Sequence, residues 1–133
     1  GQWEYGLSVP QADSSVELAT DQVLPHFEGD KAPTAIFGLR DIEALRAQQV
    51  LREHRPELLE RIEIVGYYNT PWSQAGHPPI TTVDINVEEI VRRIRVLIRN
   101  LRAGAPPRQP VQLVAPRLIV RGDTHALVKE DEG

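Results

Sequence analysis

Five side chains with the chemistry to hold a small polar ligand follow two predicted strands of this sequence. They are Arg40, Asp41, Tyr68, Asn69 and Trp72. The Asp41 carboxylate accepts hydrogen bonds from hydroxyl groups, and the Asn69 amide both donates and accepts them. The Arg40 guanidinium suits a carboxylate or a phosphate, the Trp72 ring can stack on a sugar, and Tyr68 can line the wall of a pocket. Together these residues predict a site for a hydroxyl-rich ligand.

Each of these residues also has an ordinary structural role. Asp41 stands where the N-cap of a helix belongs, and Asn69 precedes Thr-Pro, as turn residues do. Trp72 can fill the core or a subunit interface, Tyr68 can pack inside, and Arg40 can be a plain surface residue. The residue types alone leave both interpretations open.

A predicted strand–helix–strand unit would position these side chains. Residues 33–38 form a short apolar run without polar alternation, which predicts a strand buried on both faces. Residues 41–54 repeat apolar side chains at the helical period, and the helix ends before Arg55-Pro56. Residues 62–68 predict a second buried strand. Parallel strands joined by one helix form a right-handed βαβ unit, and ligands bind beyond the carboxyl ends of such strands.

The other predicted elements flank this unit. They are a weak strand at 2–9, a helix at 14–24 with a Ser14–Glu17 capping box, a core contact at Phe27, a loop at 70–79, a strand at 80–85, a helix at 87–102 and strands at 111–115 and 117–121. The helix at 87–102 is the strongest, with Asn86 as its N-cap and Gly104 as its C′ residue. Its five arginines favour a solvated face over a phosphate-binding one.

Composition restricts the function further. The 133 residues suggest one domain, and the net charge of −4 argues against a grip on nucleic acid by this chain itself. The absence of cysteine excludes disulfides and cysteine-based metal sites, and the four histidines are scattered, so we expect no metal site.

No nucleotide-binding or hydrolase motif occurs in the sequence, so we expect neither catalytic residues nor a cofactor. No run is apolar enough to cross a membrane. With no methionine and a glycine at position 1, we expect a piece of a longer protein.

Four segments resemble one known family when taken in this order and spacing. They are residues 33–37, residues 65–67, residues 79–83 and residues 117–124. Together they resemble the C-terminal half of the effector-binding core of the LacI/GalR family of bacterial transcription regulators, over about residues 10–124. A related group joins this core to a GntR-type winged-helix head, and the Tyr-Asn-Thr-Pro-Trp stretch at 68–72 resembles that group as much as the LacI group proper.

The resemblance implies an α/β fold, a three-layer αβα sandwich with a mostly parallel sheet that forms one lobe of a type I periplasmic-binding-protein-like fold. Residues 1–83 and 110–124 would belong to the C-terminal lobe. Residues 84–105 would be a crossover segment and a helix of the other lobe, and residues 125–133 a tail. The resemblance also implies a cytoplasmic homodimer that binds a small, sugar-like effector and reaches DNA only through an N-terminal head absent from this chain.

Site residues carry over one by one. Phe37 matches a position that often stacks on the ligand, Arg40 replaces a common asparagine, and Asn69 matches a position that is often aspartate or asparagine. Tyr68 replaces an aspartate that binds ligand hydroxyls, which weakens the case for a standard sugar. The loop from Trp72 to Pro79 resembles a segment of the dimer interface. A periplasmic-type sugar-binding protein for uptake is the alternative function, and a doubly wound enzyme is the third.

The helix at 87–102 also predicts self-association. Its seven large apolar residues form one stripe that would be exposed without the other lobe. Each buried aliphatic side chain contributes ~1.5–3 kcal/mol, so such a stripe favours burial. We expect this chain to bury it against a second copy or by swapping helices between two copies.

Overall fold

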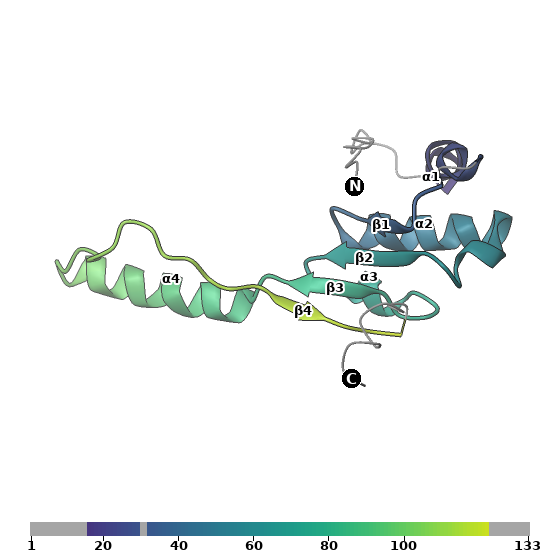
Figure 1. Ribbon diagram of the computed structural model, residues 1–133. Coiled ribbons are helices and arrows are strands. Elements are labelled where there is room, and N and C mark those ends of the chain that lie inside the picture. The colour runs from purple at the N-terminus through teal and green to yellow at the C-terminus, as the bar shows by residue number, and fades with distance from the viewer. Residues whose placement is uncertain (1–15, 30–31, 123–133) are drawn as a thin grey trace, which may run out of the picture.

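The computed structural model describes residues 16–29 and 32–122 (Figure 1). In chain order the elements are α1 (Val16–Val23), η1 (Leu24–Phe27), β1 (Ala35–Phe37), α2 (Asp41–His54), η2 (Pro56–Leu58), β2 (Glu63–Tyr67), α3 (Pro71–Gln74), β3 (Thr81–Asp84), α4 (Val87–Arg102) and β4 (Arg117–Ile119). The predicted strand–helix–strand unit is therefore confirmed as β1, α2 and β2. The helix at 87–102 is confirmed with the bounds that its apolar period predicts.

The four strands form one sheet in the order β1-β2-β3-β4. β1 pairs with β2 and β2 with β3 in parallel, whereas β4 runs antiparallel to β3. The parallel register aligns Phe37 with Val65 and Tyr67 with Val83. The carboxyl ends of β1, β2 and β3 therefore lie at one edge of the sheet, and the α/β class with a mostly parallel sheet is confirmed.

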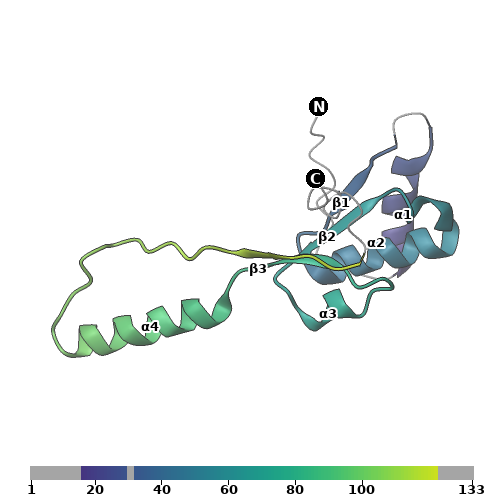
Figure 2. The ribbon, with the colours of Figure 1, turned by 60° about the horizontal axis from the view of Figure 1, so that its bottom comes forward.

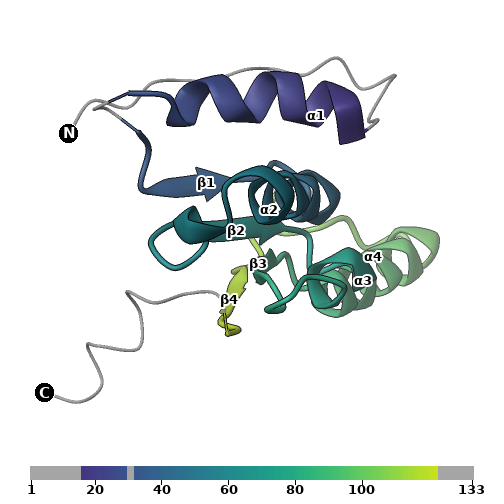
Figure 3. The same cartoon turned by 90° about the vertical axis from the view of Figure 1, so that its right-hand side faces the viewer.

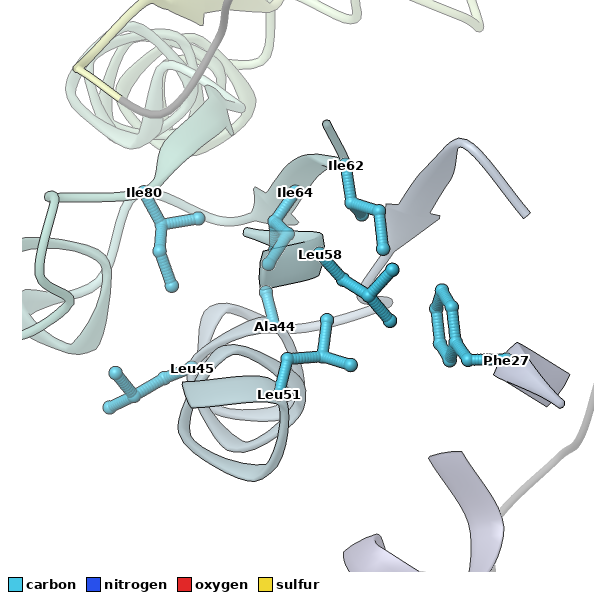
Figure 4. Packing of buried hydrophobic residues seen from close by; sticks show 8 residues of the cluster. All are labelled: Phe27, Ala44, Leu45, Leu51, Leu58, Ile62, Ile64 and Ile80. Carbon is cyan, nitrogen blue, oxygen red and sulfur yellow. The ribbon is translucent and has the colours of Figure 1, made fainter. Parts of the chain in front are cut away.

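In the part of the chain that the structure describes, the helices that pack on the sheet lie on one of its faces. α2 and α3 cover that face, and α1 packs against α2 (Figure 3). The core between α2 and the sheet contains Phe27, Ala44, Leu45, Leu51, Leu58, Ile62, Ile64 and Ile80 (Figure 4). The period of the strand explains the pattern, because Ile64 and Gly66 of β2 are buried while their neighbours along the strand are only partly covered. Phe27 is 4% exposed, which confirms its predicted core position.

The prediction that residues 33–38 are buried on both faces is wrong. In the described part of the sheet β1 is an edge strand, and Phe37 is 57% exposed while Ile36 is partly buried. Ile36 pairs with Ile64 and shares its face, toward α2. Because side chains alternate along a strand, Phe37 points to the opposite face. No helix in the described part of the chain covers that face (Figure 3). An apolar run shows that both faces of a strand could be buried. In β1 only the face toward α2 is covered.

Several local predictions need correction. Arg40, rather than Asp41, is the N-cap of α2, and the Glu43 carboxylate accepts a hydrogen bond from the Arg40 backbone N–H at 3.1 Å. Residues 71–74 of the predicted loop form α3, and residues 111–115 form no strand. Asn86 is the N-cap of α4 as predicted, but in a left-handed conformation and without a side-chain cap. The weak strand at 2–9, the Ser14 cap and the tail lie outside the described residues.

α4 extends away from the sheet, and the chain returns beside it to β4 (Figure 2). None of its residues is buried, and Val87, Ile94 and Ile98 are each about half exposed. A groove of about 490 Å³ separates α4 from the returning segment at 107–116. Gly104 follows the helix with a φ of 74°, which confirms it as the C′ residue. Among the described residues, no helix is long and apolar enough to span a membrane.

A candidate ligand rim at the carboxyl ends of the strands

A buried carboxylate organises the edge where the parallel strands end. Asp41 is fully buried, although it stands in the first turn of α2. It accepts hydrogen bonds from the backbone N–H and the hydroxyl group of Thr70, the latter at 2.8 Å, and from the hydroxyl group of Thr82. One side chain thus ties α2 to the connection after β2 and to β3. These partners occupy both carboxylate oxygens and place Asp41 beneath the rim rather than on its surface.

A glycine makes this arrangement possible. Gly66 lies in the middle of β2, on the face that packs against α2. A Cβ atom at this position would run into the Asp41 carboxylate and would lie 3.1 Å from its Cα atom. Only a residue without a side chain lets the helix approach the strand so closely.

Aromatic rings form the exposed part of the rim. Phe37 and Tyr67 meet edge to face with centroids 6.1 Å apart, and Tyr67 and Tyr68 do so at 4.8 Å. Tyr68 is 46% exposed, and Trp72, on α3, is 53% exposed. Tyr68 also has a φ of 90°, which is rare for a bulky residue. Backbone outliers of this kind concentrate at ligand sites, where the surrounding structure enforces them.

Asn69 is the polar centre of the rim. Its backbone N–H donates to the hydroxyl group of Thr82 at 3.2 Å. Its side-chain Nδ2 donates to the Asp84 carboxylate at 3.3 Å, and its Oδ1 accepts a hydrogen bond from Arg121 at 3.0 Å. Asn69 also adopts a φ of 52°. This residue is therefore part of a network rather than a simple turn former.

Arg121 contacts the rim, although no pattern in the sequence selects it as a site residue. It belongs to an Arg-Gly-Asp tripeptide with no evident role, and it follows an apolar strand. In the structure its guanidinium donates to the Ser73 hydroxyl group at 3.1 Å and to the Ile80 carbonyl at 2.9 Å, in addition to Asn69. The one sequence signal that could have indicated Arg121 is its charge, directly after an apolar strand.

Arg40 is engaged within its own helix turn. Its guanidinium donates to the Glu43 carboxylate at 2.7 Å, and about two fifths of its side chain is exposed. The Glu43 carboxylate therefore neutralises the positive charge of Arg40, which would otherwise attract a carboxylate or phosphate group of a ligand. Of the six predicted site residues, Phe37 and Tyr68 are connected through ring contacts with Tyr67. Asn69 and Trp72 belong to the segment that follows β2.

Asp84 marks the point where the chain leaves the sheet for α4. It accepts hydrogen bonds from the Asn86 backbone N–H at 2.7 Å and from Arg117 of β4 at 3.1 Å. The Asn86 N–H lowers the pKa of the Asp84 carboxyl, and Asn69 and Arg117 lower it further. The carboxylate therefore links the two strands that lead to and from α4.

The exposed groups of this rim are of the kinds that bind small ligands. No group of three or more His, Cys, Asp or Glu side chains in the described ranges could hold a metal ion. The rim offers aromatic faces, an amide and a hydrogen-bonded arginine. Such groups recognise rings and hydroxyl groups of a neutral ligand.

Comparison with known proteins agrees with the α/β fold. The family described as the periplasmic binding protein-like domain matches residues 4–124. The chain belongs to this family. Among curated relatives, the HTH-type transcriptional regulator DegA of Bacillus subtilis (strain 168) is 34% identical over 97 residues, which cover 72% of this chain and 28% of DegA.

Solved structures support the same family. A regulatory protein of the LacI family from Chloroflexus aggregans matches with a TM-score of 0.72 and 25% identity, over 89% of this chain and 44% of that one. The transcriptional regulator CelR in complex with cellobiose matches with a TM-score of 0.59 and 27% identity, over 82% of this chain and 33% of that one. The chain spans less than half the length of each of these relatives. It corresponds to part of the ligand-sensing, periplasmic-binding-protein-like domain of LacI-family transcriptional regulators.

Proposed function

We propose that this chain senses a small, sugar-like effector for a bacterial transcriptional regulator. The observation that carries the proposal is the rim itself, where exposed aromatic side chains and the hydrogen-bonded Asn69 amide follow the carboxyl ends of the parallel strands. Ligands bind at this edge in open α/β sheets. Effector contacts would come from Phe37, Tyr68, Asn69 and Trp72, with Arg40 at the margin and Asp41 holding the rim from below.

The chemistry of the rim supports a sugar or a related metabolite. Phe37, Tyr68 and Trp72 offer apolar faces on which a sugar ring or a base can stack. CelR, one of the similar structures, is in complex with cellobiose. Tyr68 brings no carboxylate for sugar hydroxyl groups, so we expect an effector with a larger flat surface or fewer hydroxyl groups than a simple monosaccharide.

A thermal-shift screen tests this function. The full gene product that contains this chain would be heated with sugars, sugar phosphates and nucleosides in turn. A ligand at a hundred times its dissociation constant stabilises the folded protein by ~2.7 kcal/mol and raises the melting temperature by degrees. We expect one chemical class to do so, and Trp72→Ala or Asn69→Ala to abolish the shift. The control Asn100→Ala, on the exposed surface of α4, should preserve it. A screen in which no compound shifts the melting temperature would contradict the proposal.

The remaining parts of the regulator are proposed from the relatives. Residues 1–83 and 110–124 would form most of one lobe, and residues 84–105 would enter the other lobe. The effector would stabilise one arrangement of the two lobes by binding it more tightly. A homodimer would transmit this change to a DNA-binding head outside this chain, in the cytoplasm, where a regulator meets its DNA. The similarity to DegA favours this function over sugar uptake.

We propose in addition that α4 is a surface for self-association. Val87, Ile94 and Ile98 expose one continuous apolar stripe, and the acidic first turn and basic last turn of α4 are complementary in an antiparallel pair. Two copies of this chain could pack or swap these helices. Sedimentation analysis of the 133-residue chain should show a dimer, which Ile94→Glu converts to a monomer. A stable monomer of the unsubstituted chain would contradict this part of the proposal.

A further inference from the structure

The Arg121 side chain holds two elements of the rim at once. One terminal nitrogen donates to the Ser73 hydroxyl group of α3 and to the Ile80 carbonyl, and the other donates to Asn69 Oδ1. The Arg121 backbone N–H also donates to the Thr81 hydroxyl group at 2.9 Å. Arg121 is partly buried, and it reaches the rim from the far end of β4. One residue thus fixes both Asn69 and the helix that carries Trp72.

The charges around Asn69 allow only one orientation of its amide. The oxygen faces the Arg121 guanidinium, and the nitrogen faces the Asp84 carboxylate. A rotation by half a turn would bring the NH₂ group against a cation and the oxygen against an anion, and both contacts would be repulsive. The contacts within the described residues use one N–H of Nδ2, and an amide nitrogen has two.

We propose that Arg121 is a positioning residue of the effector site. It locks the Asn69 amide so that the second N–H is presented to the rim as a donor, and it anchors α3 with Trp72 through Ser73. The effector then places a hydroxyl or carbonyl oxygen at this donor while its ring stacks on the neighbouring aromatic side chains. This inference rests on the proposed effector function. It adds that the Asn69 amide donates, rather than accepts, the hydrogen bond to the effector.

The orientation of Asn69 can be tested without any effector. The side-chain amide of Asn69 would be followed by ¹⁵N NMR in the 133-residue chain and assigned by its loss in Asn69→Ala. We expect its two N–H resonances to be shifted from those of a free asparagine amide, with slow hydrogen exchange for the N–H that donates to Asp84. Arg121→Lys should move both resonances toward the free-amide positions and speed this exchange, because lysine lacks the planar fork that reaches several acceptors. Ser73→Ala should leave them unchanged, since the bond from Arg121 to Asn69 remains.

This design separates positioning from simple stabilisation. If Arg121→Lys lowers the melting temperature but leaves the Asn69 resonances unchanged, Arg121 only stabilises the fold and the inference is overturned. If Arg121→Lys is too unstable to measure, Arg121→Gln provides the same comparison with a neutral side chain. The exposed Arg99→Lys is the matched control and should change neither quantity.

An effector found in the screen provides the second test. Arg121→Lys and Asn69→Ala should each weaken its binding by about tenfold, and the double variant should be little weaker than either single variant, because both remove one contact. Additive losses would overturn the inference. If no effector is found, the proposed function fails, whereas the NMR comparison still decides whether Arg121 orients Asn69.

Discussion

Two regions of this molecule use similar helices with opposite results. α2 and α4 have 14 and 16 residues, and both are amphipathic. In α2 the side chains of Val50 and Leu51 are fully buried, whereas in α4 those of Ile94 and Ile98 are 48% and 46% exposed. The sheet lobe, residues 32–84 and 117–122, supplies α2 with a packed partner. The α4 arm, residues 85–116, supplies only a returning segment beside the helix.

The contrast shows what an amphipathic pattern specifies. The period of apolar residues decides which face of a helix is available for burial. It does not decide what covers that face, because the partner is formed by distant parts of the chain or by another chain. The same pattern therefore yields a core helix in the sheet lobe and an exposed apolar face in the α4 arm.

The largest expected effect lies at the centre of the sheet lobe. Asp41→Ala removes the acceptor for the partly buried N–H and hydroxyl group of Thr70 and for the buried hydroxyl group of Thr82. Since each unsatisfied buried group costs about 1–3 kcal/mol, we expect the free energy of unfolding to fall by ~3–5 kcal/mol. Urea denaturation followed by far-UV circular dichroism measures this change. Asp21→Ala, on the exposed side of α1, is the control and should change little. A loss below about 1 kcal/mol for Asp41→Ala would show that water or a rearrangement replaces the network.

A matched pair of core-type substitutions compares the two regions directly. Leu51→Ala should lower the free energy of unfolding by ~2–5 kcal/mol, because it leaves a cavity among buried side chains. Ile98→Ala removes a half-exposed side chain and should cost less than ~0.5 kcal/mol in a monomer. The free energy of unfolding should be measured at a concentration low enough for the chain to be monomeric. If Ile98→Ala then lowers it as much as Leu51→Ala does, α4 is covered within one chain and the contrast between the two regions fails.

The close approach of α2 to β2 gives an intermediate effect. Gly66→Ala places a methyl group against the Asp41 side chain and should destabilise the fold by ~1–3 kcal/mol. Gly122→Ala is the matched control, because an added Cβ atom there lies 3.6 Å from Pro78, an ordinary contact. Thermal unfolding of both variants measures the difference. Equal melting temperatures would mean that α2 can move away from the strand without cost.

The smallest effect is expected in the α4 arm and depends on pH. Hydrogen bonds from Arg92 and Arg93 lower the pKa of Glu89 from 4.5 to about 2. The support that Glu89 gives to α4 is therefore complete above pH 4.5 and is lost as the pH falls toward 2. Because these pairs are exposed, the change in helix content should be slight and should shrink further in high salt. Circular dichroism between pH 5 and pH 2 measures it, and Glu89→Gln should remove this part of the pH dependence.

The elements themselves were largely predictable from the sequence. The helices at 41–54 and 87–102 follow from apolar spacing and from the residues that flank them, and the parallel pairing of the first two strands follows from the helix that joins them. β1 was misjudged because an apolar run does not reveal whether a strand lies at the edge of a sheet. α3 was missed because a four-residue helix carries almost no periodic signal.

The rim was predictable in its position and less so in its chemistry. The strand ends predicted Asn69 and Trp72 in the segment that follows β2. For Asp41 the residue type left a helix cap and a ligand contact open, whereas the structure shows a buried acceptor of hydrogen bonds. Its true partners, Thr70 and Thr82, lie 29 and 41 residues away. Arg121 reaches Asn69 across 52 residues, so no local pattern could have selected it.

By itself, the sequence determined the main helices and strands and the α/β class, and it predicted the edge of the sheet where a ligand would bind. Those properties depend on local spacing and on the short connections between elements. Only the tertiary structure decided which carboxylate is buried, how Asn69 is oriented and which amphipathic helix is covered. These depend on contacts between distant residues, where a few ångströms separate a ligand contact from a structural hydrogen bond.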